Sequence, residues 1–401
     1  DAIVESCGIK RPQGATVFTT DEALAAALTI GYPVLVRPSY VLGGQGMTIA
    51  YSDDDIREYM DIININEQEH PILIDKYLMG VELEVDAVSD GENILVPGIM
   101  EHLERAGIHS GDSISIFPAY IPDRFRDEIV DYTARLAKAL HVIGLINIQF
   151  ILYNEDIYVI EVNPRSSRTV PYISKVTGIP IVDLATRVMT GARLGDLGYG
   201  TGLYARYPAI YAIKAPVFSF EKLHNVDTSL GPEMKSTGEV LGLSRKYSEA
   251  MYKAILASGF KFPARGSGIL MSVRDSDKSD LLPLAEQLFD MGYELYATGG
   301  TANYLIRHGV PANAVRKLEE ERPNVLSLVS DGKVKLLINT TSTSLKDRGS
   351  ILLRRHCIEH GVPTITSLDT LVAVNECLQR QLEPKDLTPL EISSFAGIVL
   401  D

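Results

Sequence analysis

Residues Leu145–Arg165 read LINIQFILYNEDIYVIEVNPR, and their pattern indicates the fold class of the first part of the chain. Two runs with alternating apolar positions, Leu145–Tyr153 and Ile157–Val162, flank the polar residues Asn154–Asp156. Alternation with a period of two indicates strands, and a short polar interruption between two strands indicates a hairpin. The pattern therefore predicts an antiparallel pair within an α+β domain.

The register of this hairpin decides which polar side chains meet. If the three polar residues between the strands form the loop, Tyr153 pairs with Ile157 and Gln149 lies opposite Glu161. A slip of one residue would turn Gln149 to the other face. Alternation also puts Asn163 on the face of Glu161. This wall of two amides and a carboxylate would supply the oxygen ligands that Mg²⁺ prefers. The alternative is a half-buried strand that shows its polar face to water.

Two arginines follow the second strand directly, in Pro164–Arg168 (PRSSR). Positive charge next to a metal site suits the negative charge that develops on a transferred phosphoryl group. Arg165 and Arg168 therefore favour the metal-site interpretation over the solvated strand.

A glycine-rich stretch, Leu42–Gly46 (LGGQG), lies between predicted strands at Val34–Pro38 and Met47–Tyr51. Glycines leave backbone N–H groups free to approach phosphate oxygens. No Gly-Lys-Ser/Thr sequence follows, so this is not a Walker loop, and a simple hairpin turn is an equal alternative. Arg37, which precedes the loop, is either an edge arginine or a phosphate ligand.

Two more polar segments are candidates for nucleotide contacts. Gly107–Ser113 (GIHSGDS) is rich in hydrogen-bond donors, although a lone histidine such as His109 is more often structural than catalytic. Asp75–Leu78 is followed by Glu82, and in this arrangement backbone groups would hold an adenine while the carboxylate would bind the ribose hydroxyls. Further strands are predicted at Ile72–Tyr77 and Val81–Val88, and a helix at Arg126–Leu140.

From Gly268 onward strands and helices alternate, which predicts a small doubly wound parallel sheet. The boundary with the first part is expected near Phe260–Arg265. The expected strands are Ile269–Val273, Tyr293–Thr298, Lys335–Asn339 and Val362–Ser367, and the expected helices are Ser279–Met291, Ala302–His308, Ile351–His360 and Leu371–Leu378.

Loops at the ends of neighbouring parallel strands meet in one crevice. Three such loops, Arg274–Lys278, Thr298–Thr301 and Asn339–Ser342, are rich in donors, and Lys317 is expected beside them. A threonine-capped helix start offers N–H groups to a phosphate. Each loop alone has ordinary Gly/Ser/Thr chemistry, but their coincidence favours an anion site.

The composition excludes several functions. A net charge of −14 argues against nucleic-acid and acidic-membrane partners. The three cysteines, Cys7, Cys357 and Cys377, form neither a CxxC pair nor a disulfide framework, so a reduced, cytoplasmic setting is expected. The sequence starts at Asp1 and not at a methionine, and we expect it to belong to a longer protein.

Five stretches of the sequence resemble the carbamoyl-phosphate synthetase large-chain family. They are Val36–Gly44, Gly98–His102, Ala106–Ser113, Ile160–Arg165 and Gly231–Glu239. The resemblance implies an ATP-grasp unit at 1–190, its remainder and a linker at 191–262, and a methylglyoxal-synthase-like allosteric domain at 263–401. Together with the form of the glycine loop, it implies the second half of the large chain, which phosphorylates carbamate to carbamoyl phosphate for pyrimidine and arginine synthesis.

The resemblance also implies roles for individual residues. ATP would contact Arg37, Lys76, Leu78, Glu82, Gly107, Ile108, His109, Ser110, Gln149 and Glu161. Mg²⁺ or Mn²⁺ would bind Gln149, Glu161 and Asn163, and Arg165 and Arg168 would face the phosphates and carbamate as catalytic residues. An effector, most simply UMP and otherwise IMP or phosphoribosyl pyrophosphate, would contact Lys278, Thr298, Thr301, Lys317, Asn339 and Thr341. The implied protein partners are the N-terminal half of the large chain and a glutaminase small subunit.

The sequence departs from the family pattern at two points. Gln45 stands where many members have an arginine, and Thr343–Asp347 replaces the Gly-Asp-rich catalytic segment of methylglyoxal synthase, which implies a sensor domain and not a lyase. Two other functions stay open. One is another ATP-grasp ligase that joins a carboxylate to an amine, and the other is a non-catalytic nucleotide-binding regulatory fragment.

Overall fold

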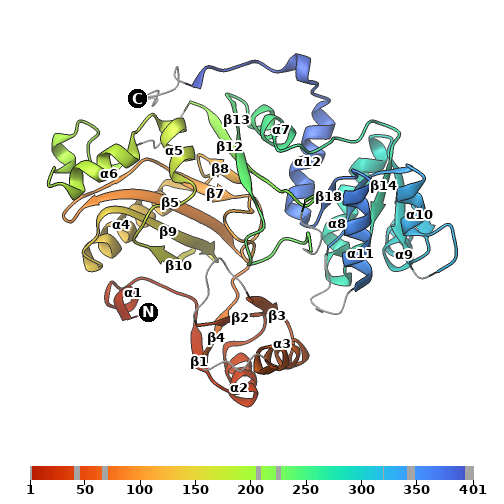
Figure 1. The fold of residues 1–401 in the computed structure, drawn as a ribbon, viewed down its shortest axis with the longest axis horizontal. Helices are drawn as coiled ribbons and strands as arrows, with labels where there is room; N and C mark the ends of the chain where they lie inside the picture. Colours follow the sequence, from red (N-terminus) through yellow and green to blue (C-terminus); the bar gives the residue numbers. More distant parts are fainter. Residues whose placement is uncertain are drawn as a thin grey trace.

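The structure is a computed structural model of the 401-residue chain. It describes residues 2–39, 46–65, 71–204, 209–222, 227–318, 320–340 and 348–392, and the side chains of 62–65 are not described. Most of the predicted glycine loop, Thr341, the 343–347 segment and everything from Ser393 onward therefore lie outside the described residues. Three sheets form the frame of the described parts (Figure 1).

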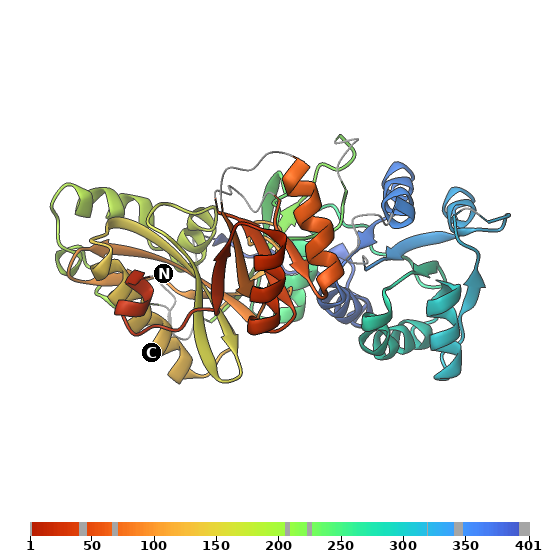
Figure 2. The same ribbon diagram turned by 90° about the horizontal axis from the view of Figure 1, so that it is seen from below.

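A small lobe is built on an antiparallel sheet in the order β1 (Gly14–Val17), β4 (Ile72–Lys76), β2 (Val34–Pro38) and β3 (Thr48–Ala50). Helices α2 (Thr20–Ile30) and α3 (Asp53–Ile65) cover its outer face, and Figure 2 shows both in front of the sheet when seen from below. A capping box between Thr19 and Glu22 starts α2. The core between the layers includes Val34, Val36, Ile72 and Ile74.

The large sheet has the order β10 (Asp156–Asn163), β9 (Ile143–Tyr153), β5 (Val81–Asp90), β7 (Ile99–His102), β8 (Ser115–Phe117), β12 (Tyr211–Val217) and β13 (Gly238–Ser244), with β6 (Ile94–Val96) and β11 (Gly202–Leu203) beside it. Helix α4 (Asp123–Ala139) packs on one face against Leu83, Val85, Ile148 and Phe150. Helices α5 (Val170–Thr177) and α6 (Ile181–Met189) pack against Val88, Met100 and Phe117. A short helix, α1 (Ala2–Ser6), precedes the small lobe.

The β9–β10 hairpin reaches the predicted pairing by a different route. Its turn has two residues and not three, because Tyr153 pairs with Asp156 and not with Ile157. Both turn residues, Asn154 (φ 49°) and Glu155 (φ 68°), adopt the left-handed conformation that two-residue hairpin turns require. A β-bulge at Ile160 then shifts the register by one residue. The bulge restores the predicted pair of Gln149 and Glu161.

The C-terminal sheet is parallel throughout its described strands, in the order β16 (Asn313–Val315), β15 (Glu294–Thr298), β14 (Gly268–Met271), β17 (Val334–Ile338) and β18 (Thr364–Ile365). Its helices are α8 (Lys278–Asp290), α9 (Gly299–Arg307), α10 (Val325–Ser330), α11 (Arg348–Glu359) and α12 (Leu368–Arg380). The predicted elements are confirmed with shifted ends, whereas β16 and α10 were not predicted.

One hydrophobic core crosses the expected boundary at Phe260–Arg265. Residues 191–262, where the sequence predicts only the remainder of the ATP-grasp unit and a linker, contain a hairpin of β12 and β13, and α7 (Tyr247–Ala257) packs on it. Ile213 and Met251 of this unit belong to the same buried cluster as Ile269 and Leu371 of the C-terminal domain. The two domains therefore share a core and do not meet only at their surfaces.

Candidate functional site

The large sheet carries a row of polar side chains on the face opposite α4. On β5, Glu82, Glu84 and Asp86 alternate with the apolar residues that pack on α4. On β9, Gln149 pairs with Glu84 and Asn147 pairs with Asp86, so these side chains share that face. One face of the sheet is therefore apolar and packs on α4, and the opposite face is polar and forms the base of a polar site.

The three predicted metal ligands, Gln149, Glu161 and Asn163, lie along one edge of this face and are called here the metal wall. Gln149 lies opposite Glu161, and Asn163 pairs with Asn147. The Gln149 Nε2 donates to Ser110 Oγ at 2.9 Å, which leaves the amide oxygen as an acceptor. Glu161 is exposed and makes no hydrogen bond or ion pair with any described residue. An exposed, unpaired carboxylate between two amide oxygens fits a hard divalent cation.

His102 on β7 lies between two carboxylates under the site. Its Nδ1 is 3.3 Å from Glu82 Oε1 and its Nε2 is 3.0 Å from Glu84 Oε2. Burial lowers the pKa of His102, but the charge of Glu82 and the bonds to both carboxylates outweigh burial and raise the pKa to about 10. The predicted ribose ligand, Glu82, is thus a buried partner of a charged histidine in this structure.

Asp86 lies deeper in the same network. It accepts hydrogen bonds from Ser167 Oγ at 2.6 Å, from Thr169 Oγ1 at 2.6 Å and from Asn147 Nδ2 at 3.0 Å. Burial, followed by repulsion from the Glu84 carboxylate, raises the pKa of Asp86 to about 6. Neighbouring buried carboxylates repel one another, and one of them is driven toward its protonated form.

A donor-rich loop, residues 107–113, stands over the metal wall and is called here the donor loop. His109 Nδ1 accepts the Gly111 N–H at 3.0 Å, which leaves the proton of the neutral imidazole on Nε2. Burial lowers the pKa of His109, so the neutral ring predominates at neutral pH. The buried Lys214 donates to the Ser110 carbonyl at 3.1 Å. Ser110 thus connects the loop to Gln149 and to β12.

The predicted adenine side is apolar. Leu78 is buried with Ala106 and Ile151 in a small cluster between the small lobe and the large sheet. Gly107 has a φ of 100°, and a Cβ there would lie 2.8 Å from Ile49 Cδ1, so only glycine fits where the donor loop meets the small lobe. Ile108 follows it in the loop and is half-buried.

Two predicted ATP ligands of the small lobe are engaged within the protein. Lys76 Nζ donates to the carbonyls of Gly31 and Tyr32 at 2.7 and 3.1 Å. Arg37, on the face opposite the α2/α3 core, forms an ion pair with Asp75 at 2.8 Å. The Lys76 side chain therefore stabilises the turn before β2 by its hydrogen bonds. Arg37 lies on the sheet face that α2 and α3 do not cover.

The two predicted catalytic arginines lie at the end of β10 and are exposed. Arg165 Nη2 donates to Asn163 Oδ1 at 3.2 Å. Arg168 Nη1 contacts Met234 Sδ at 2.8 Å and Ser236 Oγ at 3.2 Å. Arg165 is thus next to the metal wall, and Arg168 is held by residues 227–236, which are called here the connecting segment.

A pocket of about 520 Å³ opens at the carboxyl ends of the parallel strands of the C-terminal sheet. Its walls contain four of the predicted effector residues, Lys278, Thr298, Thr301 and Lys317, together with Thr340. Asn339 is buried beneath it, with its amide bonded to the Ser272 carbonyl and to Arg354. Lys278 Nζ is paired with Asp275 at 2.6 Å.

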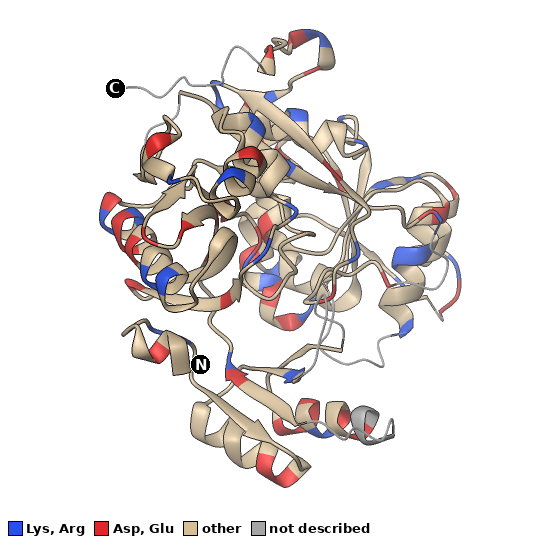
Figure 3. Ribbon diagram, turned by 60° about the vertical axis from the view of Figure 1, so that its left-hand side comes forward, with Lys and Arg blue, Asp and Glu red and all other residues tan. Residues whose placement is uncertain are grey.

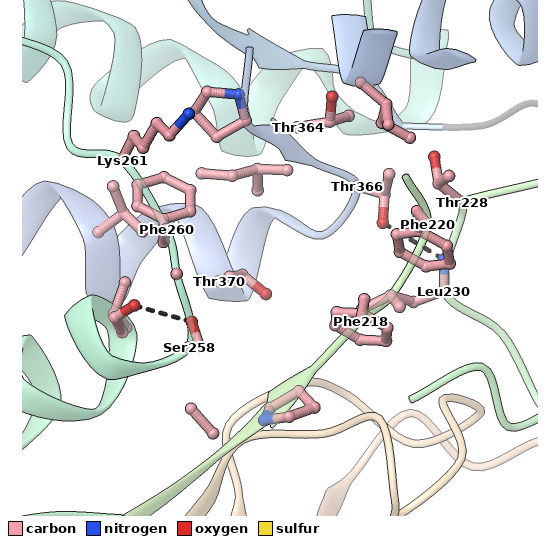
Figure 4. A pocket seen from close by; sticks show the side chains of 18 of the residues that line it. Phe218, Phe220, Thr228, Leu230, Ser258, Phe260, Lys261, Thr364, Thr366 and Thr370 are labelled. Atoms are coloured by element: carbon pink, nitrogen blue, oxygen red, sulfur yellow. Dashed lines mark hydrogen bonds between the residues drawn. The ribbon is translucent and has the colours of Figure 1, made fainter. Parts of the chain in front are cut away.

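Another cavity lies between the two domains (Figure 4). Phe218 and Phe220, stacked 4.9 Å apart, and the connecting-segment residues Thr228 and Leu230 form one side, and Thr366 of the C-terminal domain faces them. The Leu230 N–H donates to Thr366 Oγ1 at 3.3 Å across it. Its volume is about 270 Å³, so this part of the interface is not close-packed.

The sequence matches known families over both domains. Residues 1–197 match the family described as carbamoyl-phosphate synthase L chain, ATP binding domain, and residues 280–366 match the MGS-like domain. The carbamoyl phosphate synthase large chain of Lachnoclostridium phytofermentans is 58% identical over 381 residues, which are 94% of this chain and 36% of that protein. The chain belongs to the carbamoyl phosphate synthase large-chain family.

A second member of the family gives a similar match. The carbamoyl phosphate synthase large chain of Agathobacter rectalis is 53% identical over 99% of this chain and 37% of its own length. The chain thus spans a little more than a third of these synthase large chains.

Solved structures show the fold of the first domain. The biotin carboxylase of Campylobacter jejuni, solved as a β,γ-ATP complex, has a TM-score of 0.50 at 18% identity and covers 63% of this chain and 64% of its own. An N5-carboxyaminoimidazole ribonucleotide synthetase with ADP has a TM-score of 0.51 at 16% identity and covers 64% and 69%. The first domain therefore has the ATP-grasp fold, followed by the MGS-like parallel sheet.

Several site residues were missed from the sequence. Glu84, Asp86 and Asn147 share the polar sheet face, and the buried Lys214 reaches the donor loop. The alternation Glu82-Leu83-Glu84-Val85-Asp86 carried a signal for the first two, because it marks one polar face of a strand. Lys214 had no local signal.

Proposed function

We propose that this chain is the carbamate-phosphorylating half of a carbamoyl phosphate synthase large chain, which forms carbamoyl phosphate and ADP from carbamate and ATP. The observation that carries the proposal is the wall of Gln149, Glu161 and Asn163, with Arg165 bonded to its end and the donor loop bonded to Gln149. Acidic and basic residues are spread over the whole fold in Figure 3, so a local cluster has to meet the anionic substrates.

The chain's own residues act by positioning and charge. Gln149, Glu161 and Asn163 would hold Mg²⁺ or Mn²⁺, which neutralises charge on the ATP phosphates when bound. Arg165 and Arg168 would face the transferred phosphoryl group, and the donor loop would offer the Nε2–H of His109, because the backbone N–H groups of residues 109 and 111–113 already donate within the protein. Catalysis of this kind rests on alignment and electrostatic stabilisation more than on proton transfer.

The reverse reaction tests this assignment. The full-length large chain, with its glutaminase partner, is expected to make ATP from MgADP and carbamoyl phosphate, and the 401-residue chain is assayed beside it. If the full chain makes no ATP but forms ADP with an amine and another carboxylate, the chain is a different ATP-grasp ligase. If it binds nucleotides without turnover, the chain is a regulatory fragment.

The C-terminal pocket supports an effector role. Lys278, Lys317, Thr298 and Thr301 line it, which suits a phosphorylated ligand such as UMP, IMP or phosphoribosyl pyrophosphate. The other proposed partners are the preceding half of the large chain and the glutaminase subunit. We propose that the enzyme acts in the cytoplasm and that its product is used in pyrimidine and arginine synthesis. Among the described residues no helix is long and apolar enough to cross a membrane. Calorimetry of the whole chain with each of the three ligands tests the pocket.

A further inference from the structure

We infer that Arg354 is the positioning residue that couples the C-terminal pocket to the donor loop of the nucleotide site. This inference rests on the proposed effector role. The Arg354 side chain is only 1% exposed, and among the described residues it is the largest side chain that is fully buried. A buried guanidinium needs charged or polar partners, because the cost of removing it from water is otherwise uncompensated.

The partners of Arg354 come from both domains. Its Nη1 donates to Asn339 Oδ1 at 2.7 Å, within the C-terminal domain. Its Nε and Nη2 donate to Asp227 Oδ1 at 2.9 and 2.7 Å, at the start of the connecting segment. Burial raises the pKa of Asp227, but the Arg354 charge and the bonds from Ser229 outweigh it, so the pKa is lowered and the pair stays charged.

On the effector side, Arg354 is tied to the pocket in two ways. Asn339 Nδ2 donates to the carbonyl of Ser272, which lines the pocket. Helix α11 itself contributes Ser350 and Leu353 to the pocket wall, and Leu353 is the residue before Arg354. A ligand that moves α11 or Ser272 would therefore move the guanidinium.

On the nucleotide side, the connecting segment holds the donor loop along its length. The Gly231 carbonyl accepts the His109 N–H at 2.8 Å. Both oxygens of Asp112 accept backbone N–H groups, from Lys235 at 2.7 Å and from Ser236 at 2.8 Å. Because Ser110 lies between these anchors and bonds to Gln149, a shift of the segment reaches the metal wall.

The interface leaves room for such a shift. The cavity of Figure 4 borders Thr228 and Leu230, so one side of the connecting segment faces free volume and not a close-packed core. Coupling between sites needs an element with two arrangements that both ligands bias. Helix α11, Arg354 and the connecting segment would be this element, because their hydrogen bonds connect the pocket at one end to the donor loop at the other.

The test uses the full-length large chain with its glutaminase subunit and UMP as the probe. The KM for MgADP in the reverse reaction is measured with and without saturating UMP, and UMP binding is measured by calorimetry. Allosteric factors are typically about 5–150-fold. In Arg354→Met the ratio of the two KM values should fall to near 1, while UMP still binds and the KM without UMP changes little. Arg354→Lys should give a ratio between that of Arg354→Met and that of the wild type. Lysine keeps the positive charge but lacks the planar guanidinium that donates to Asp227 and Asn339 together.

Two further variants make the result interpretable. Asp227→Asn removes the other half of the ion pair at a partly exposed position and should also collapse the ratio, even if Arg354→Met proves unstable. Arg355→Met is the matched control, because Arg355 lies on the same helix and also crosses to the first domain, at the Phe220 carbonyl. The control should keep the wild-type ratio.

The outcomes separate this inference from the proposed function. A wild-type ratio that persists in both Arg354→Met and Asp227→Asn overturns the role of Arg354 alone. UMP that binds the wild type without changing the KM also overturns the coupling, but leaves the pocket. If the wild type binds none of UMP, IMP and phosphoribosyl pyrophosphate, the effector role fails and the inference fails with it.

Discussion

Gln149 pairs with Glu161 because the extra residue of a bulge at Ile160 compensates for a hairpin turn that is one residue shorter than the sequence suggested. The two deviations cancel, so the oxygen ligands still share one face. Bulges commonly lie beside active sites and re-aim side chains there. The bulged residue packs at the edge of the Leu78 cluster, so the same irregularity borders both the proposed metal wall and the proposed adenine side.

Glu161→Gln tests the metal wall. It removes the single carboxylate among the proposed ligands, and carbamoyl phosphate formation by the full-length enzyme should fall by about 10²-fold or more. Bicarbonate-dependent ATPase should be largely intact, because the family resemblance assigns bicarbonate phosphorylation to the preceding half of the large chain. Glu155→Gln, an exposed residue in the turn of the same hairpin, is the control and should change neither rate. An unchanged synthesis rate in Glu161→Gln would remove Glu161 from the site.

His102 predicts a pH dependence of stability. Its folded pKa is raised from 6.5 to about 10, so the stabilisation by Glu82 and Glu84 is fully present below pH 6.5 and is lost as the pH rises through about 10. His102→Gln should therefore flatten the fall of the melting temperature between pH 6.5 and 10. His308→Gln, at the exposed end of α9, should keep the wild-type slope. Equal slopes in all three proteins would mean that His102 is neutral in the folded state.

The effector pocket predicts opposite effects for two neighbouring charges. Lys278→Ala or Lys317→Ala should weaken UMP binding about tenfold or more, because each removes a charge-assisted contact to the phosphate. Asp275→Asn should strengthen binding several-fold, because Asp275 competes for Lys278. Lys335→Ala, exposed on β17, is the calorimetric control. Thr301→Ala is less informative, since Thr301 Oγ1 accepts a buried N–H from Val273. Wild-type affinity in Lys278→Ala, Lys317→Ala and Asp275→Asn would place the ligand elsewhere.

Gly242 predicts a packing effect between β13 and α7. A Cβ at Gly242 would lie 2.2 Å from the Ala250 carbonyl oxygen and 2.5 Å from the Ala254 nitrogen. Gly242→Ala should therefore destabilise the chain by about 1–3 kcal/mol, as overpacking does. On the same strand, a Cβ at Gly238 meets only Val217 at 3.8 Å, so Gly238→Ala should unfold like the wild type. Chemical denaturation of both variants measures the difference.

Local pattern predicted much of the fold. The strands Val34–Pro38 and Tyr293–Thr298 and the helix Ser279–Met291 are confirmed within a residue or two at each end. Hydrophobic periodicity, and the residues that end a helix or strand, are local signals that can be identified in the sequence. The C-terminal parallel sheet followed from its strand–helix alternation. The β12–β13 hairpin was missed, because Ala, Gly and Pro within these strands weaken the alternation that marks a strand.

The candidate site was predictable only in part. The metal wall needed one hairpin, which the sequence contains as a continuous stretch. The ion pairs of His102 and the bridge between Arg354 and Asp227 join residues 18–20 and 127 positions apart, and no local pattern encodes such contacts. Lys76 shows a further limit, since its position on the strand could be predicted but not the carbonyls that engage its side chain.

The core shared by α7, β12 and the C-terminal sheet has a consequence for protein engineering. A regulatory hybrid made by joining two synthases between Ala257 and Gly268 would set two unrelated halves of one hydrophobic interior against each other. Such hybrids should express as aggregates or with loosened packing, whatever their effector chemistry. A transplant that includes the β12–β13 hairpin and α7 with the sheet keeps the interior of one parent. The natural unit of exchange therefore begins near Tyr211, well before the boundary that the sequence suggests near Phe260–Arg265.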